Sequence, residues 1–187
     1  SSKGFAAMGR QALELGANTF QFFTRNPRGS RAKDLDPADA AALRDLLARH
    51  GFRFSKSMGQ NFLIQPWVPR DIACSSGAGS GKGVLEIGPG IGPLTRELSL
   101  LADQVVSVEL DRSLLPILTE TLGDRDNVEI VSGDILKLDI PSLVRERFQG
   151  LEPIACANLP YNITTPAITA LLDAGCFSSI TIMIQRE

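Results

Sequence analysis

The stretch "VLEIGPGIGPLT", residues 84–95, decides the fold expected for this chain. It joins a short apolar run to a segment of helical character, and three glycines, Gly88, Gly90 and Gly92, lie between them. Because glycine has no Cβ, such a loop turns sharply and lets the backbone approach a ligand closely. A glycine loop between a strand and a helix is typical of nucleotide-binding α/β sheets, although a plain tight turn uses the same residues.

Short apolar runs alternate with helical segments beyond this loop. The runs are rich in β-branched residues and bounded by Gly, Asp or Asn. We expect a helix at 65–76, strands at 83–88, 104–110, 127–133, 153–158 and 179–184, and helices near 92–102, 113–122, 141–148 and 165–174. This alternation predicts an α/β fold, a Rossmann-like parallel sheet with helices on both faces.

The first 52 residues have a different character. A helix is expected at 6–16, a strand at 18–23, a basic loop at 24–33 and a helix at 36–51, where Asp36 and Pro37 mark the start. Residues 1–52 carry a charge of +3 and residues 53–187 one of −5. We therefore divide the chain into a fragment at 1–52 and a domain at 53–187. The acidic balance of that domain is unlike that of a free-standing nucleic-acid binder.

The composition excludes several kinds of site. His50 is the only histidine, which argues against a histidine triad or a multi-histidine metal site, and we expect no metal. The three cysteines lie far apart without CxxC spacing, which favours reduced thiols and a cytoplasmic protein. No apolar run approaches the roughly 18 residues of a membrane span, so no membrane partner is expected.

Acidic residues near the ends of the first three strands extend the glycine motif. Glu109 ends the second strand and suits the two hydroxyls of a ribose, and Asp134 follows the third strand and suits an adenine amino group. Glu86, near the end of the first strand, suits a cation such as an amino group. Each acid alone is more often a cap or loop residue, but together they predict a pocket for an adenosine-bearing cofactor.

Two cofactors fit such a pocket. NAD requires the full dinucleotide fingerprint, which has Gly or Ala where this chain has Pro93. S-adenosyl-L-methionine carries no phosphate and tolerates a looser loop with several acids. The sequence favours the methyl donor and keeps a nicotinamide dehydrogenase as an alternative.

A second motif ends the fourth strand in "ACANLPYNITTP", residues 155–166. Asn158, Leu159, Pro160 and Tyr161 present an amide, a carbonyl, a rigid residue and an aromatic ring at one strand end. Taken alone, this is a strand-to-helix turn with proline as punctuation.

These motifs resemble, in order, those of the ribosomal RNA adenine dimethyltransferases. The resemblance covers about 53–187 and rests on "KSMGQNFL" (56–63), "VLEIGPGIGPLT", "VVSVELD", "GDILKLD" and "ANLPYNITTP". It implies a cytoplasmic enzyme that uses S-adenosyl-L-methionine to methylate two adjacent adenosines near the 3′ end of small-subunit rRNA in immature 30S particles. It is expected to act as a monomer. A binding module that holds cofactor or RNA without catalysis is the alternative.

The resemblance also assigns roles to residues. Asn158, Leu159, Pro160 and Tyr161 become catalytic candidates, since the first two offer oxygens to the target amine and Tyr161 offers a stacking face. The cofactor-binding candidates are Gln60, Asn61, Leu63, Glu86, Gly88, Gly90, Gly92, Glu109, Asp134 and Asn158. Family members continue through further strands and a basic helical domain, so the strand at 179–184 is expected at an exposed sheet edge.

Residues 1–52 resemble the opening of endonuclease IV, a metal-dependent abasic-site nuclease with a TIM-barrel fold. "GANTFQFFTRNPRG" (16–29) carries the resemblance, and it makes Arg25 and Arg28 candidate DNA contacts. The metal-binding histidines of that family are absent, and one or two βα units cannot close a barrel. We therefore expect a fused fragment without nuclease activity.

Overall fold

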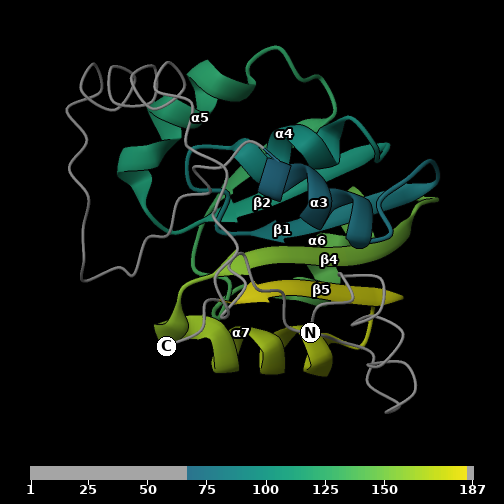
Figure 1. Ribbon diagram of the computed structural model, residues 1–187. Coiled ribbons are helices and arrows are strands. Elements are labelled where there is room, and N and C mark those ends of the chain that lie inside the picture. Colours follow the sequence, from purple (N-terminus) through teal and green to yellow (C-terminus); the bar gives the residue numbers. More distant parts are fainter. Residues whose placement is uncertain (1–66, 185–187) are drawn as a thin grey trace, which may run out of the picture.

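The computed structural model describes residues 67–184 (Figure 1). The expectations for residues 1–66, among them the front fragment and Gln60, Asn61 and Leu63, lie outside this range. In chain order the elements are α3 (Trp67–Ser75), β1 (Lys82–Ile87), α4 (Pro93–Ser99), β2 (Gln104–Glu109), the 3₁₀ helix η2 (Arg112–Leu114), α5 (Leu115–Leu122), β3 (Val128–Ser132), α6 (Ile140–Arg147), β4 (Glu152–Leu159), α7 (Tyr161–Ala174) and β5 (Ser179–Ile184).

The five strands form one parallel sheet in the order β3-β2-β1-β4-β5. This arrangement confirms the expected α/β fold, and each expected strand lies within one residue of its place at either end. Because all strands run the same way, their carboxyl ends meet at one edge of the sheet. Within the described residues β5 is an edge strand, as expected for 179–184.

Helices cover both faces of the sheet (Figure 1). Val84, Val105 and Ile154 pack against α3 and α4 on one face, and α5 covers β3 on the same side. Leu85, Val106 and other alternate residues face α6 and α7 on the opposite side. None of the helices within 67–184 is long and apolar enough to cross a membrane.

Helix α4 is shorter than the helix expected at 92–102, because its chain turns away after Ser99. Asn127, which precedes β3, donates from its side-chain amide to the carbonyls of Ser99 and Ala102 at 2.9 and 3.0 Å. These bonds satisfy carbonyls that a longer helix would satisfy internally. The acceptors lie 25 or more residues from Asn127 in the chain, so the local sequence does not reveal this end.

Helix α7 begins at Tyr161, four residues before the helix expected near 165–174. Pro160 is its N-cap residue, and the Pro160 carbonyl accepts bonds from the Ile163 N–H and the Thr164 hydroxyl. Pro166 therefore lies inside the helix. The sequence-based start was wrong because proline usually occurs in the first turn, whereas this helix continues through it.

A test of packing arises at Gly83 in β1. A Cβ at this position would lie 2.4 Å from the Cγ and Cδ1 atoms of Phe148, whose ring is 5% exposed. Gly83→Ala should therefore lower the free energy of unfolding by about 1–3 kcal/mol, the usual cost of overpacking. Urea denaturation measures the change.

Gly79→Ala is the matched control, because no atom lies within 4 Å of its Cβ position. It should change stability by less than about 0.5 kcal/mol. In a Phe148→Ala background the cost of Gly83→Ala should largely disappear. Equal costs of Gly83→Ala with and without the ring would contradict this packing.

Candidate functional site

The glycine loop between β1 and α4 forms a tight corner at the carboxyl edge of the sheet. Gly88, Gly90 and Gly92 adopt φ values of 70, 62 and 92°, which side-chain-bearing residues rarely adopt. The three glycine N–H groups donate within the chain, to the Val108 carbonyl, the Glu109 carboxylate and the Pro89 carbonyl at 3.0, 3.2 and 2.9 Å. A Cβ at Gly88 would have no atom of the described residues, 67–184, within 4 Å, so this part of the structure leaves the corner open there.

Glu109 ends β2, as expected, and its carboxylate also supports the glycine corner. One oxygen accepts from the Gly90 N–H at 3.2 Å and the other from the Asp111 N–H at 2.7 Å. Burial raises the pKa of this carboxyl, and the two backbone hydrogen bonds oppose that rise. A carboxylate has about four acceptor positions, so Glu109 keeps acceptor capacity for a ligand.

The strand register aligns Glu109, Gly88 and Asn158 on one face. Ile87 pairs with Val108 of β2 and with Ala157 of β4, so the next residue of each strand follows in the same row. The carboxyl-end residues of β2 and β4 therefore flank the glycine corner. With neighbouring strands about 4.8 Å apart, their Cα atoms are separated by roughly 10 Å. Asn158 is half-buried.

Glu86 lies one row deeper on the same face and is only 1% exposed. Its carboxylate accepts a hydrogen bond of 2.6 Å from the Ser107 hydroxyl. The pKa of Glu86 is raised from 4.5 to about 7, chiefly because burial disfavours the charged form; the hydrogen bond from Ser107 opposes the rise, and the charge of Glu109 adds to it. A role for Glu86 in pairing with a ligand cation stays a prediction.

Sequence reasoning missed Ser107 as a partner of Glu86. Ser107 is the signal that the sequence did offer, since it interrupts the apolar run "QVVSVEL" in a strand buried on both faces. A buried hydroxyl requires a polar partner, and the register supplies Glu86 directly beside it.

Asp134 follows β3 by two residues, at the same sheet edge as Glu109. One carboxylate oxygen accepts from the Leu136 N–H at 3.1 Å, and the other lies 3.3 Å from the Lys137 ammonium. The side chain is 26% exposed, so it remains accessible to a ligand. Its local bonds also fit the simpler interpretation of a turn residue, and its cofactor role stays a prediction.

The residues at the end of β4 divide between core and surface. The Leu159 side chain is 1% exposed and belongs to the core on the α6–α7 face, so only its backbone can serve a ligand. Pro160 has an extended ψ of 151° and starts α7. Tyr161 is the first residue of that helix, and its side chain lies outside the described part of the chain.

A family model described as "Ribosomal RNA adenine dimethylase" matches residues 51–187, well over half of the chain. The chain belongs to this family. The match includes the glycine corner, the acids of the sheet edge and the end of β4, and it confirms the resemblance that the motifs carry. It does not extend to the front fragment, for which the resemblance to endonuclease IV stays an untested prediction, as does the boundary at 52/53.

Curated relatives in this family bear the name "Ribosomal RNA small subunit methyltransferase A". The chain is 44% identical to the protein of Clostridioides difficile (strain 630) over 147 residues, which are 78% of this chain and 51% of that protein. It is 45% identical to the protein of Oceanobacillus iheyensis over 152 residues, 80% of this chain and 52% of that protein. The chain thus spans about half the length of the curated relatives it matches.

Solved structures agree with the family and the fold. The 23S rRNA methyltransferase ErmE superposes with a TM-score of 0.56 at 33% identity, covering 67% of this chain and 48% of that one. A dimethyladenosine transferase from Plasmodium falciparum gives a TM-score of 0.56 at 25% identity, covering 68% and 44%. The Rossmann-like sheet described above is therefore a methyltransferase sheet.

Proposed function

We propose that this chain carries the activity of its family, N6-dimethylation of two adjacent adenosines near the 3′ end of small-subunit rRNA. The methyl donor is S-adenosyl-L-methionine, and the substrate is the rRNA of an immature 30S particle. The enzyme works in the cytoplasm as a monomer without a metal ion. The family membership and the geometry of the glycine corner support this proposal.

The bonding of the glycine corner is the observation that carries it. A diphosphate would require free N–H groups at the start of α4. Here Gly88, Gly90 and Gly92 donate within the chain, and Pro93 at the start of the helix has no N–H. The Glu109 carboxylate beside the corner would also repel a diphosphate. These features favour an adenosine cofactor without phosphate over NAD.

The two carboxylates at the edge of the sheet, Glu109 and Asp134, are suited to bind the ribose and the adenine of the cofactor. Glu109 would accept bonds from the ribose hydroxyls with the acceptor positions that Gly90 and Asp111 leave. Asp134 would accept from the adenine amino group. The open side of Gly88 leaves room for close approach of the ligand. Gln60 and Asn61 remain candidates for the methionine end, and Leu63 remains a cofactor-binding candidate.

The end of β4 suits the target base. The exocyclic amine of adenine is a poor nucleophile, because its lone pair is delocalised into the ring. The Asn158 side-chain oxygen and the Leu159 carbonyl would accept its two hydrogens and direct its lone pair. Pro160 restricts the backbone of the preceding residue to extended conformations, and Tyr161 would stack on the base. When bound, S-adenosyl-L-methionine supplies an electrophilic methyl group, so positioning rather than a strong base provides most of the rate.

Two measurements on the chain test this function. Isothermal titration should detect binding of S-adenosyl-L-methionine and no binding of NAD. Radiolabelled methyl groups should then appear in undermethylated 30S particles at N6 of adenosine. Cofactor binding without transfer would favour a non-catalytic module, and NAD binding would contradict the assignment of the corner.

Glu109→Ala should raise the dissociation constant for S-adenosyl-L-methionine by at least about tenfold, since hydrogen bonds to a charged group contribute about 1.5–3 kcal/mol. The variant also releases the Gly90 N–H, which loosens the corner. Titration calorimetry measures the change. Glu146→Ala is the control, because Glu146 is an exposed carboxylate on α6, which covers the opposite face of the sheet. Equal affinities in the two variants would refute a cofactor role for Glu109.

A further inference from the structure

The second half of the glycine corner is held from α5, a helix to which the sequence motifs assign no role. The Thr121 hydroxyl, at the end of α5, donates to the Ile91 carbonyl across 30 residues of sequence at 3.0 Å. The helix approaches the corner closely: a Cβ at Gly92 would lie 3.1 Å from Leu122 and 3.2 Å from the Thr121 hydroxyl oxygen. The corner thus contacts β2 through Glu109 and α5 through Thr121.

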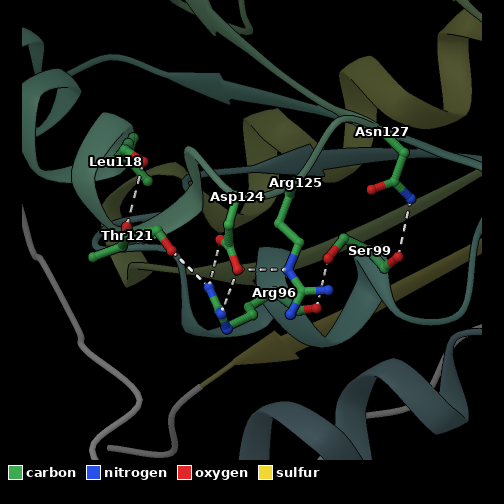
Figure 2. A network of polar contacts seen from close by, with 7 residues as sticks. All are labelled: Arg96, Ser99, Leu118, Thr121, Asp124, Arg125 and Asn127. Atoms are coloured by element: carbon green, nitrogen blue, oxygen red, sulfur yellow. Dashed lines mark hydrogen bonds and ion pairs between the residues drawn. The ribbon is translucent and has the colours of Figure 1, made fainter.

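Thr121 is itself fixed by the helix that the corner leads into. Arg96 of α4 donates to the Thr121 carbonyl at 2.8 Å, and its guanidinium makes two bonds of 3.0 and 2.8 Å to the Asp124 carboxylate (Figure 2). Arg125 lies 3.6 Å from the same carboxylate. A two-pronged Arg–carboxylate pair restricts orientation as well as distance. The end of α5 is therefore tied to α4. The Thr121 hydroxyl also lies 3.4 Å from the Leu118 carbonyl of its own helix, so the 3.0 Å contact with Ile91 is the shorter of its two acceptor contacts.

We propose that Thr121 is a positioning residue for the cofactor site: its bond to the Ile91 carbonyl fixes the glycine corner in the conformation that receives the adenosine cofactor. This inference rests on the function proposed above. Ile91 lies between Gly90 and Gly92, which are the most freely rotating residues of the loop. A hydrogen bond to Ile91 restricts the backbone of both neighbouring glycines, whereas the hydrogen bond from Gly90 to Glu109 restricts Gly90 alone.

The matched variants are Thr121→Val, Thr121→Ser and Thr119→Val in the 187-residue chain. Valine keeps the shape of threonine without the hydroxyl, and serine keeps the hydroxyl. Thr119, on the same helix, is exposed and donates its hydroxyl only to the Leu115 carbonyl within α5. It therefore reports the effect of the same substitution without a bond to the corner.

We expect Thr121→Val to raise the dissociation constant for S-adenosyl-L-methionine by about three- to tenfold, the usual effect of one neutral hydrogen bond. Thr121→Ser and Thr119→Val should stay within about twofold of the parent. Amide hydrogen exchange of residues 88–92 should be faster in Thr121→Val alone, with β1 unchanged. This second measurement does not depend on ligand binding.

Unchanged affinity and unchanged exchange in Thr121→Val, with a parent chain that binds the cofactor, would overturn the role of Thr121 and leave the proposed function standing. A similar loss in Thr121→Val and Thr119→Val would also overturn it, because the effect would then come from α5 stability. A parent chain that binds no S-adenosyl-L-methionine would overturn the proposed function, and this inference with it.

Discussion

Asn158→Ala should reduce methyl transfer at least about 100-fold while the affinity for S-adenosyl-L-methionine changes less than about twofold. Loss of one preorganised hydrogen-bonding group at a reacting centre typically costs 10²–10³ in rate. Asn158 follows Ala157 in a strand that borders β1, so it flanks Gly88 on the side opposite Glu109. That placement favours contact with the substrate base, whereas we expect Glu109 to contact the cofactor.

Single-turnover transfer to undermethylated 30S particles measures the rate, in a version of the chain extended to the length of the curated relatives. Asn158→Asp is the informative companion, because a carboxylate keeps the accepting oxygens and should retain part of the rate. Thermal unfolding checks that the fold survives in both variants. Parental rates in Asn158→Ala, or a loss of cofactor affinity equal to that of Glu109→Ala, would contradict the separate roles of the two residues.

Local sequence patterns were sufficient for the elements that carry this site. β-Branched runs bounded by Gly, Asp or Asn located all five strands, because strand burial requires apolar residues in short continuous runs. The helices between the strands then predicted a parallel sheet. In such a sheet the carboxyl ends of β2 and β4 lie at the same edge. Glu109 and Asn158 could be expected together for this reason alone.

Contacts between segments that are distant in the chain could not be predicted from local sequence patterns. The bond from Gly90 to Glu109, and the bond from Thr121 to Ile91, join residues 19 and 30 positions apart. Neither leaves a local pattern, since Thr121 is an ordinary residue near the end of a helix. The start of α7 was missed because Pro166 dominated the local signal. Sequence therefore identified the candidate ligand-binding residues more readily than the residues that hold them in place.

Glu86→Gln should remove a pH dependence of stability that amounts to about 3 kcal/mol in the parent. Burial raises the pKa of Glu86 from 4.5 to about 7 in the folded chain. Below about pH 4.5 the carboxyl is neutral in both the folded and the unfolded chain, so burial of a charge costs no stability there. As the pH rises from about 4.5 to about 7, the unfolded chain releases the proton while the folded chain retains it, so stability falls. Above about pH 7 the loss is complete.

Urea denaturation between pH 4 and 8 at constant ionic strength measures the difference between parent and variant. The pKa of Glu109 is also raised by burial, so its contribution has the same sign. Because the charge of Glu109 also acts on Glu86, that contribution cancels only in part in the difference. Glutamine stays neutral at every pH and can bond to Ser107. The variant should gain stability relative to the parent as the pH rises.

Ser107→Ala tests the cause of this behaviour. The Ser107 hydroxyl donates to the Glu86 carboxylate at 2.6 Å and lowers its pKa, so its removal should raise the pKa and move the end of the stability loss to higher pH. Because Ser107, Glu86 and the glycine corner share one face of the sheet, ionisation of Glu86 places a charge directly beneath the corner. Parallel stability profiles for the parent and Glu86→Gln would mean that folding does not shift the pKa of this carboxyl.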